Sequence, residues 1–145
     1  VRHMYPEADI PVLQFSIDFN KPAQYHYDLA KELMALRKKG VLILGSGNMV
    51  HNLRMVAWDK IDQTYGFDWA IEMNEIFKEK INSGDHKALI DYEKLNKAAL
   101  LAIPTPDHCY PLLYTLGLRQ ENEEVNIFND KPMAGSLTMT SVKFG

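Results

Sequence analysis

The sequence predicts an α/β fold with a mostly parallel central sheet, flanked by helices and followed by strands at the C-terminal end. The first observation is that residues 10–45 contain an apolar segment, an amphipathic helical segment and a second apolar segment, the order of a strand–helix–strand crossover. The second is that residues 135–145, GSLTMTSVKFG, alternate in polarity as a strand does. With 145 residues, 46% of them hydrophobic, we expect one domain or part of a larger single-domain fold.

The crossover is predicted from three consecutive segments. Residues 10–18, IPVLQFSID, are rich in β-branched and aromatic residues and are bounded by prolines, which predicts a strand. Residues 22–39 predict a helix that ends at Gly40, because apolar residues recur there at helical spacing: Tyr25, Leu29, Leu33 and Leu36. Residues 41–44, VLIL, are apolar at every position, which is typical of a strand covered on both faces.

Helices are predicted through the middle of the chain. Residues 67–81 place apolar side chains on one face, and residues 85–101 favour one or two short helices. In IPTPDHCYPLLYTLGL, Thr105 can cap a helix that begins at Pro106 and runs to Gly117. This prediction places Asp107 and His108 in the first turn. A strand at residues 125–128 is a possible partner for the terminal strand.

Composition argues against several classes of protein. The net charge is −3 and the lysines are interleaved with acidic residues, so nucleic acid is not an expected partner. Cys109 is the single cysteine, which excludes an internal disulfide. No apolar run approaches the ~18 residues of a membrane-spanning helix, so we expect a cytoplasmic protein with no membrane partner. The chain starts Val-Arg-His-Met, as though a preceding part were missing.

The segment VLILGSGNMVHNLR, residues 41–54, allows two interpretations. A dinucleotide fingerprint would need a third glycine where a valine stands, and the lysine and serine of a P-loop are absent, so no nucleotide cofactor is predicted. Alternatively, Gly45 and Gly47 turn the chain sharply at the end of a strand and present three polar residues there: His51, Asn52 and Arg54. We favour this second interpretation because loops at strand ends often carry function. A histidine that caps a helix or is satisfied in the core remains the structural alternative.

His108 is the second candidate functional residue. Three prolines stiffen the backbone around it, which suits a metal ligand whose geometry must be held closely. The remaining histidines show no ligand spacing with His108 and are expected to be solvated: His3, His26 and His86. Three neighbouring residues are expected in the core: Cys109, Tyr110 and Tyr114. Asp107 is expected to stabilise the helix N-terminus.

Three motifs together resemble a known family. GSGNMVHNLR, PTPDHCYPLLYTLG and the closing GSLTMTSVKFG closely resemble the class III, LigB-type extradiol ring-cleavage dioxygenases, and among them the DOPA 4,5-dioxygenase-like proteins. The resemblance extends from MYPEADIPVLQFSID to the last residue. It implies that residues 1–145 are the C-terminal portion of a LigB-type domain. The N-terminal half, which in the family carries two further metal-ligating histidines, is then missing here.

The resemblance also implies a reaction and its residues. Such enzymes use non-haem Fe(II) and O₂ to open the ring of a catechol such as DOPA, giving a muconic semialdehyde-type product. In this sequence His51 would be the catalytic acid/base and His108 a metal ligand. Apart from the resemblance, Asn52 and Arg54 could orient the substrate carboxylate or His51, and an arginine one turn into a helix is about as often a structural pairing. Zinc could occupy the same site without running the oxygen chemistry. The implied partners are the catechol, O₂ and the missing N-terminal half.

Two other functions stay open at this point. One is a non-catalytic interaction or metal-binding protein on a dioxygenase-like scaffold. The other is a nucleotide-binding module that uses the loop from Gly45 to Gly47.

Overall fold

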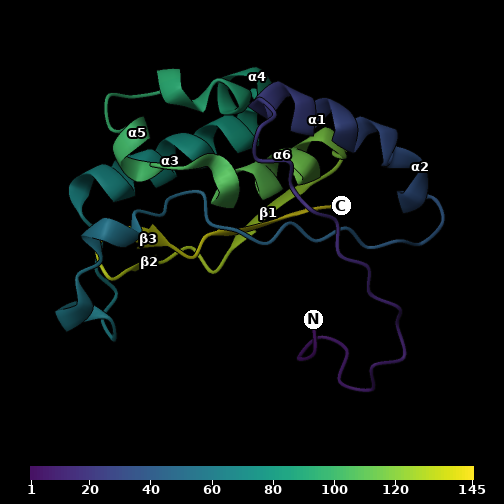
Figure 1. Cartoon of the computed structure of the whole chain (residues 1–145), viewed down its shortest axis with the longest axis horizontal. Coiled ribbons are helices and arrows are strands. Elements are labelled where there is room, and N and C mark those ends of the chain that lie inside the picture. The colour runs from purple at the N-terminus through teal and green to yellow at the C-terminus, as the bar shows by residue number, and fades with distance from the viewer.

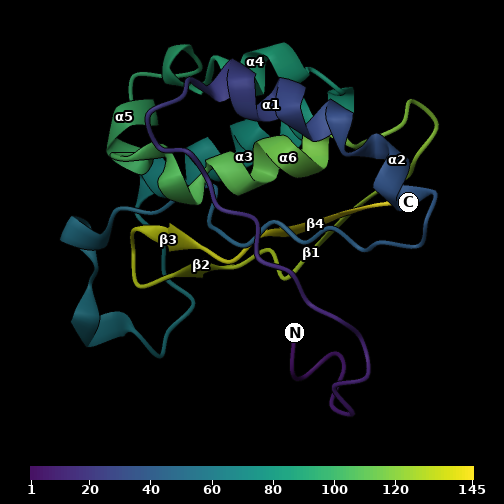
Figure 2. The same ribbon diagram turned by 45° about the vertical axis from the view of Figure 1, so that its right-hand side comes forward.

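The computed structural model describes residues 1–145 and shows a mixed arrangement of helices and short strands. Figures 1 and 2 show the helices gathered in one layer, with the strands and long irregular segments beneath them. The helices are α1 (Ala23–Glu32), α2 (Met34–Arg37), α3 (Asp68–Ser83), α4 (His86–Ile90), α5 (Ala99–Ala102) and α6 (Tyr110–Gly117). Short 3₁₀ turns are η1 (Leu53–Met55), η2 (Trp58–Lys60), η3 (Tyr92–Lys94) and η4 (Pro106–His108). None of the helices combines the length and the apolar character that crossing a bilayer requires.

The strands form two small antiparallel sheets. β1 (Val125–Phe128) pairs with β4 (Ser141–Phe144), which confirms the predicted pairing of residues 125–128 with the C-terminal segment. β2 (Pro132–Met133) pairs with β3 (Leu137–Thr138). The terminal segment therefore contributes to both sheets, and β3 continues toward the loop that holds His51 through an isolated bridge between His51 and Leu137.

The predicted parallel sheet is not formed by these residues. Residues 10–18 and 41–44 contain no strand, and no backbone–backbone hydrogen bond involves residues 10–17 or 42–47. Ile17 and Ile43 pack beside α1 and α6, but most other apolar side chains of the two segments are exposed: Ile10, Val12, Leu13, Phe15, Val41, Leu42 and Leu44. A parallel strand needs a neighbouring strand to bond with, and a ladder of only two strands is marginally stable. Both segments have the apolar pattern of a strand, but residues 1–145 form no parallel sheet that they could join.

The helices agree with the predictions more closely, except for the face that α1 buries. The helix predicted over residues 22–39 is interrupted at Leu33, where α1 gives way to α2. The buried side chains of α1 are His26 and Ala30, whereas Tyr25 on the predicted stripe is exposed. The reason is that α1 packs on α6, where the Tyr114 hydroxyl lies 2.9 Å from His26 Nδ1 and makes burial of the histidine tolerable.

The core lies among α3, α5 and α6 and fixes the elements around the site. α3 buries Phe77 and Ile81 as predicted, whereas Ile71 of the predicted face is exposed, and the helix ends at Gly84, which has a left-handed φ of 72°. Its partners are on the following helices, and the fully buried large side chains include Met73, Phe77, Ile81, Leu113 and Leu116. Residues 85–101 form short helices and one 3₁₀ turn, as the sequence indicates.

Expressed alone, the chain is expected to be poorly soluble and to bind no metal specifically. Exposed apolar side chains and unpaired backbone groups coincide on residues 10–17 and 42–47, a combination that favours association. Leu42→Lys should raise the soluble fraction, because charge on an unpaired segment opposes strand-to-strand association. Leu100→Lys, on the exposed surface of α5, is the matched control and should raise the soluble fraction less. A monodisperse monomer with a cooperative thermal transition would contradict this prediction.

Candidate metal and catalytic site

His51 lies on a loop that is hydrogen-bonded to two other parts of the chain. Its backbone N–H donates to the carbonyl of Ala102 at 2.8 Å, at the end of α5. On the other side, the backbone N–H of Thr138 donates to the carbonyl of Val50 at 3.2 Å. The side chain of Asn48 adds a hydrogen bond to the carbonyl of Thr138 at 2.7 Å. The loop is therefore fixed between α5 and β3, and His51 is buried within it.

The His51 ring faces a backbone carbonyl on each side. Nδ1 lies 3.2 Å from the carbonyl oxygen of Asn48, and Nε2 lies 3.0 Å from that of Thr105. Burial lowers the pKa of His51, and the nearby His108 imidazole lowers it further. A neutral imidazole carries one N–H and donates to only one of these carbonyls. The lone pair of the other ring nitrogen faces the second carbonyl, so a proton taken up there would form a second hydrogen bond.

His108 and Asp107 lie side by side on η4. Nδ1 of His108 is 2.6 Å from Oδ2 of Asp107, which leaves Nε2 as the ring nitrogen available to a metal. Burial raises the pKa of Asp107, but hydrogen bonds from the Thr105 hydroxyl, its own backbone N–H and His108 outweigh it and lower the pKa overall. Asp107 is therefore a carboxylate at neutral pH. Thr105 precedes the turn as predicted, but its side chain makes no helix-capping bond.

The two histidines predicted to be functional converge in space. The ring centroids of His51 and His108 are 4.7 Å apart, with the planes inclined by 32°. One ligand atom from each of His51, Asp107 and His108 lies within 4.8 Å of the other two. Two imidazoles and a carboxylate are donors that suit non-haem iron or zinc, so the residues fit a divalent transition-metal ion. Asp107 is expected from the sequence only to stabilise a helix terminus, although its position directly before a candidate ligand is a signal for a supporting carboxylate.

Gly45 and Gly47 allow the loop to approach η4 and α6. A Cβ atom on Gly47 would lie 2.1 Å from the carbonyl oxygen of His108, and one on Gly45 would lie 2.5 Å from that of Pro111. Both distances are too short for any side chain. The glycines are thus explained by close packing of the His51 loop on the segment that carries His108, which supports the second interpretation of the motif.

Asn52 and Arg54, the two tentative substrate residues, differ in their surroundings. Asn52 is buried, its Nδ2 donates to the carbonyl of Leu101 at 2.8 Å, and its Oδ1 accepts from the Arg54 backbone N–H at 3.1 Å. The side chain of Arg54 is exposed at η1 and forms no ion pair. Arg54 is therefore open to a carboxylate, whereas Asn52 is bonded within the protein.

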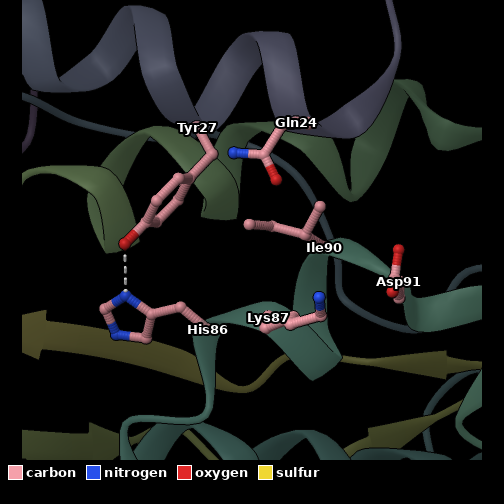
Figure 3. Close-up of a pocket in the computed structure, with 6 residues that line it drawn as sticks. All are labelled: Gln24, Tyr27, His86, Lys87, Ile90 and Asp91. Carbon is pink, nitrogen blue, oxygen red and sulfur yellow. Dashed lines mark hydrogen bonds between the residues drawn. The ribbon is translucent and has the colours of Figure 1, made fainter.

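The prediction that His26 and His86 are solvated is wrong. His26 is fully buried against Tyr110 and Tyr114, which are core residues as expected, and burial lowers the pKa of His26. His86 lines a pocket between α1 and α4 that includes no candidate site residue (Figure 3). Its Nδ1 lies 2.9 Å from the hydroxyl of Tyr27, and burial lowers its pKa. Each of the two histidines has a tyrosine hydroxyl as its partner, a pairing of distant residues that spacing does not reveal.

Cys109 is buried in the core as predicted, and burial raises the pKa of its thiol to about 12. The thiol is therefore protonated at neutral pH and is not offered to a metal.

Comparison with known proteins gives consistent matches over the whole chain. Residues 1–144 match the profile of a family described as the catalytic LigB subunit of aromatic ring-opening dioxygenase. A 4,5-DOPA dioxygenase extradiol from Escherichia coli (strain K12) is 40% identical over 145 residues, which cover 98% of this chain and 52% of the relative. A protein of the same name from Beta vulgaris is 32% identical over 143 residues, covering 97% of this chain and 52% of the relative.

A solved structure shows the same architecture. The crystal structure of an uncharacterized protein from Escherichia coli K12 superposes with a TM-score of 0.89 at 39% sequence identity, covering 99% of this chain and 59% of that one. The chain therefore spans about half the length of the curated relatives it matches.

Proposed function

The chain belongs to the LigB family of aromatic ring-opening dioxygenases, and from this membership we propose that it forms part of an extradiol dioxygenase that opens the ring of a catechol such as DOPA. The single observation that carries the proposal is the convergence of His51, Asp107 and His108. These residues come from two distant segments, HNLR and PTPDH, and meet in a chain that is 40% identical to a 4,5-DOPA dioxygenase extradiol.

The donors in this chain make up part of a metal site. His108 would hold the metal through Nε2, with Asp107 orienting its ring. When bound, a non-haem Fe(II) ion supplies catechol chelation and the oxygen chemistry; zinc would be held by the same donors without that chemistry. We propose that the remaining ligands come from the part of the LigB domain that lies outside these 145 residues. The completed domain is this chain together with that part of the LigB domain.

His51 would transfer protons during the reaction. One nitrogen of its buried ring keeps a hydrogen bond to a backbone carbonyl, and the other accepts a proton from a catechol hydroxyl. The same nitrogen returns the proton as the ring opens. We propose that Arg54, which is exposed and forms no ion pair, binds the carboxylate of an amino-acid catechol, which would favour DOPA over simple catechols.

Oxygen uptake tests the proposed function. The completed domain, loaded with Fe(II), should consume one O₂ per L-DOPA and form a coloured ring-opened product. The metal-free protein serves as one control. L-tyrosine, a phenol with one of the two ring hydroxyls of L-DOPA, serves as the other. Absence of oxygen uptake in a folded, iron-loaded completed domain would refute the proposal and favour a non-catalytic protein on the same scaffold.

The glycine loop gives a stability prediction for the same site. Gly47→Ala in the completed domain should lower the free energy of unfolding by about 1–3 kcal/mol, because a Cβ there overlaps the carbonyl oxygen of His108. Ser46→Ala, an exposed neighbour, is the control and should change it by less than about 0.5 kcal/mol. Urea unfolding measures both. Equal stability of Gly47→Ala and wild type would show that the loop does not pack on η4 as described.

A further inference from the structure

We propose that Asn52 and Ser136 act as a pair of positioning residues that hold His51 in its working orientation. The inference rests on the proposed function, because it concerns how that site keeps its proton-transfer residue in place. In this role neither residue contacts the substrate or the metal.

Asn52 and Ser136 are joined by two reciprocal hydrogen bonds. The backbone N–H of Asn52 donates to the carbonyl of Ser136 at 3.1 Å, and the hydroxyl of Ser136 donates to the carbonyl of Asn52 at 2.8 Å. Ser136 is fully buried and Asn52 nearly so. The backbone N–H and C=O of Asn52, the residue that follows His51, are thus both held by one residue of the terminal segment.

The side chain of Asn52 connects this pair to α5. Its Nδ2 donates to the carbonyl of Leu101, and the next carbonyl, that of Ala102, accepts from the backbone N–H of His51. The backbone on both sides of His51 is therefore fixed to two separate segments, the end of α5 and the terminal segment. Because Oδ1 and Nδ2 of Asn52 both bond to the backbone, the geometry favours a supporting role for Asn52 over substrate binding.

The backbone before Ser136 is bent so that both of its polar groups reach Asn52. Ala134 and Gly135 adopt left-handed conformations, with φ of 49° and 79°. Alanine rarely takes this conformation, and such backbone persists only where the surroundings hold it. Here hydrogen bonds from Ala57 to Ala134 and from Phe67 to Gly135 hold the bend. The bend directs the Ser136 hydroxyl and carbonyl toward the backbone C=O and N–H of Asn52.

The loss of this pair should affect the His51 ring before it affects the core. Both ring contacts are to backbone carbonyls, so the ring orientation depends on the backbone around it. Ser136→Ala removes only a hydroxyl: the Asn52 carbonyl keeps the Met55 N–H as a donor but loses the one that ties it to the terminal segment. A small misplacement of a catalytic group is costly to rate but need not alter binding.

The test combines kinetics with NMR on the completed domain. Ser136→Ala should lower kcat by about 10- to 100-fold, with KM for the catechol and metal content unchanged. In the zinc-loaded form, the ring signals of His51 should shift while those of the buried His26 and His86 stay in place. Ser136→Cys, which keeps a weak donor, should be intermediate. Ser141→Ala is the matched control. The Ser141 hydroxyl also donates to a backbone carbonyl, that of Met139 at 3.2 Å, but Ser141 lies on β4.

Each other outcome overturns the proposal. Wild-type kcat with unmoved His51 signals in Ser136→Ala and Ser136→Cys would show that the pair does not position His51. Loss of metal, or shifts that spread to His26 and His86, would show a general structural role. If the completed domain opens no ring at all, the proposed function fails, and the NMR comparison still decides whether the pair orients His51.

Discussion

His108→Ala in the completed domain is expected to lose its metal and all ring opening. His108 offers Nε2 from a turn stiffened by prolines, and its Nδ1 lies 2.6 Å from Oδ2 of Asp107, so alanine removes the one metal ligand assigned to this chain. Elemental analysis after dialysis and oxygen uptake with L-DOPA measure the two losses. His86→Ala is the matched control: it also removes a partly buried histidine, but one in the separate pocket between α1 and α4. Full metal content in His108→Ala would contradict its assignment as a ligand.

His51→Ala is expected to keep its metal and to slow ring opening by about 10²–10⁴-fold, the usual effect of removing a general acid or base. The ring of His51 contacts backbone carbonyls, and its proposed role is proton transfer. His51→Gln retains polar atoms near those carbonyls but cannot exchange a proton at neutral pH, so it should be nearly as slow. Turnover per bound metal ion is the quantity to measure. A wild-type rate in His51→Gln would show that proton transfer does not depend on this residue.

Local sequence predicted the helices better than the strands and the sheet. The terminal strand and its partner at residues 125–128 were predictable because both strands lie within the chain. Residues 10–18 and 41–44 carry a strand-like pattern, but hydrogen-bonded pairing depends on neighbours that these residues do not provide. The buried face of α1 was missed for a related reason. His26 is buried because Tyr114, far along the chain, offers it a hydrogen bond, and no periodicity reports that.

In the candidate site, too, local sequence indicates some of the residues, while their contacts depend on the fold. His51 and His108 were found because glycines and prolines mark their loops and because the motifs resemble a family. Their proximity follows only from the fold. Ser136 was not found, since a serine in an alternating segment has no distinguishing signal, and its relation to Asn52 depends on the left-handed bend at Ala134 and Gly135. Asp107 lay next to a candidate ligand and was assigned only to the helix terminus.

Metal content of His51→Ala and His108→Ala, measured side by side in the completed domain with turnover of L-DOPA, tests most directly whether one histidine holds the metal and the other moves protons. The expected result is wild-type metal content with slow turnover in His51→Ala, and no bound metal in His108→Ala. If His51→Ala loses metal as completely as His108→Ala, or turns over at the wild-type rate with metal bound, the division of roles between the two histidines is wrong.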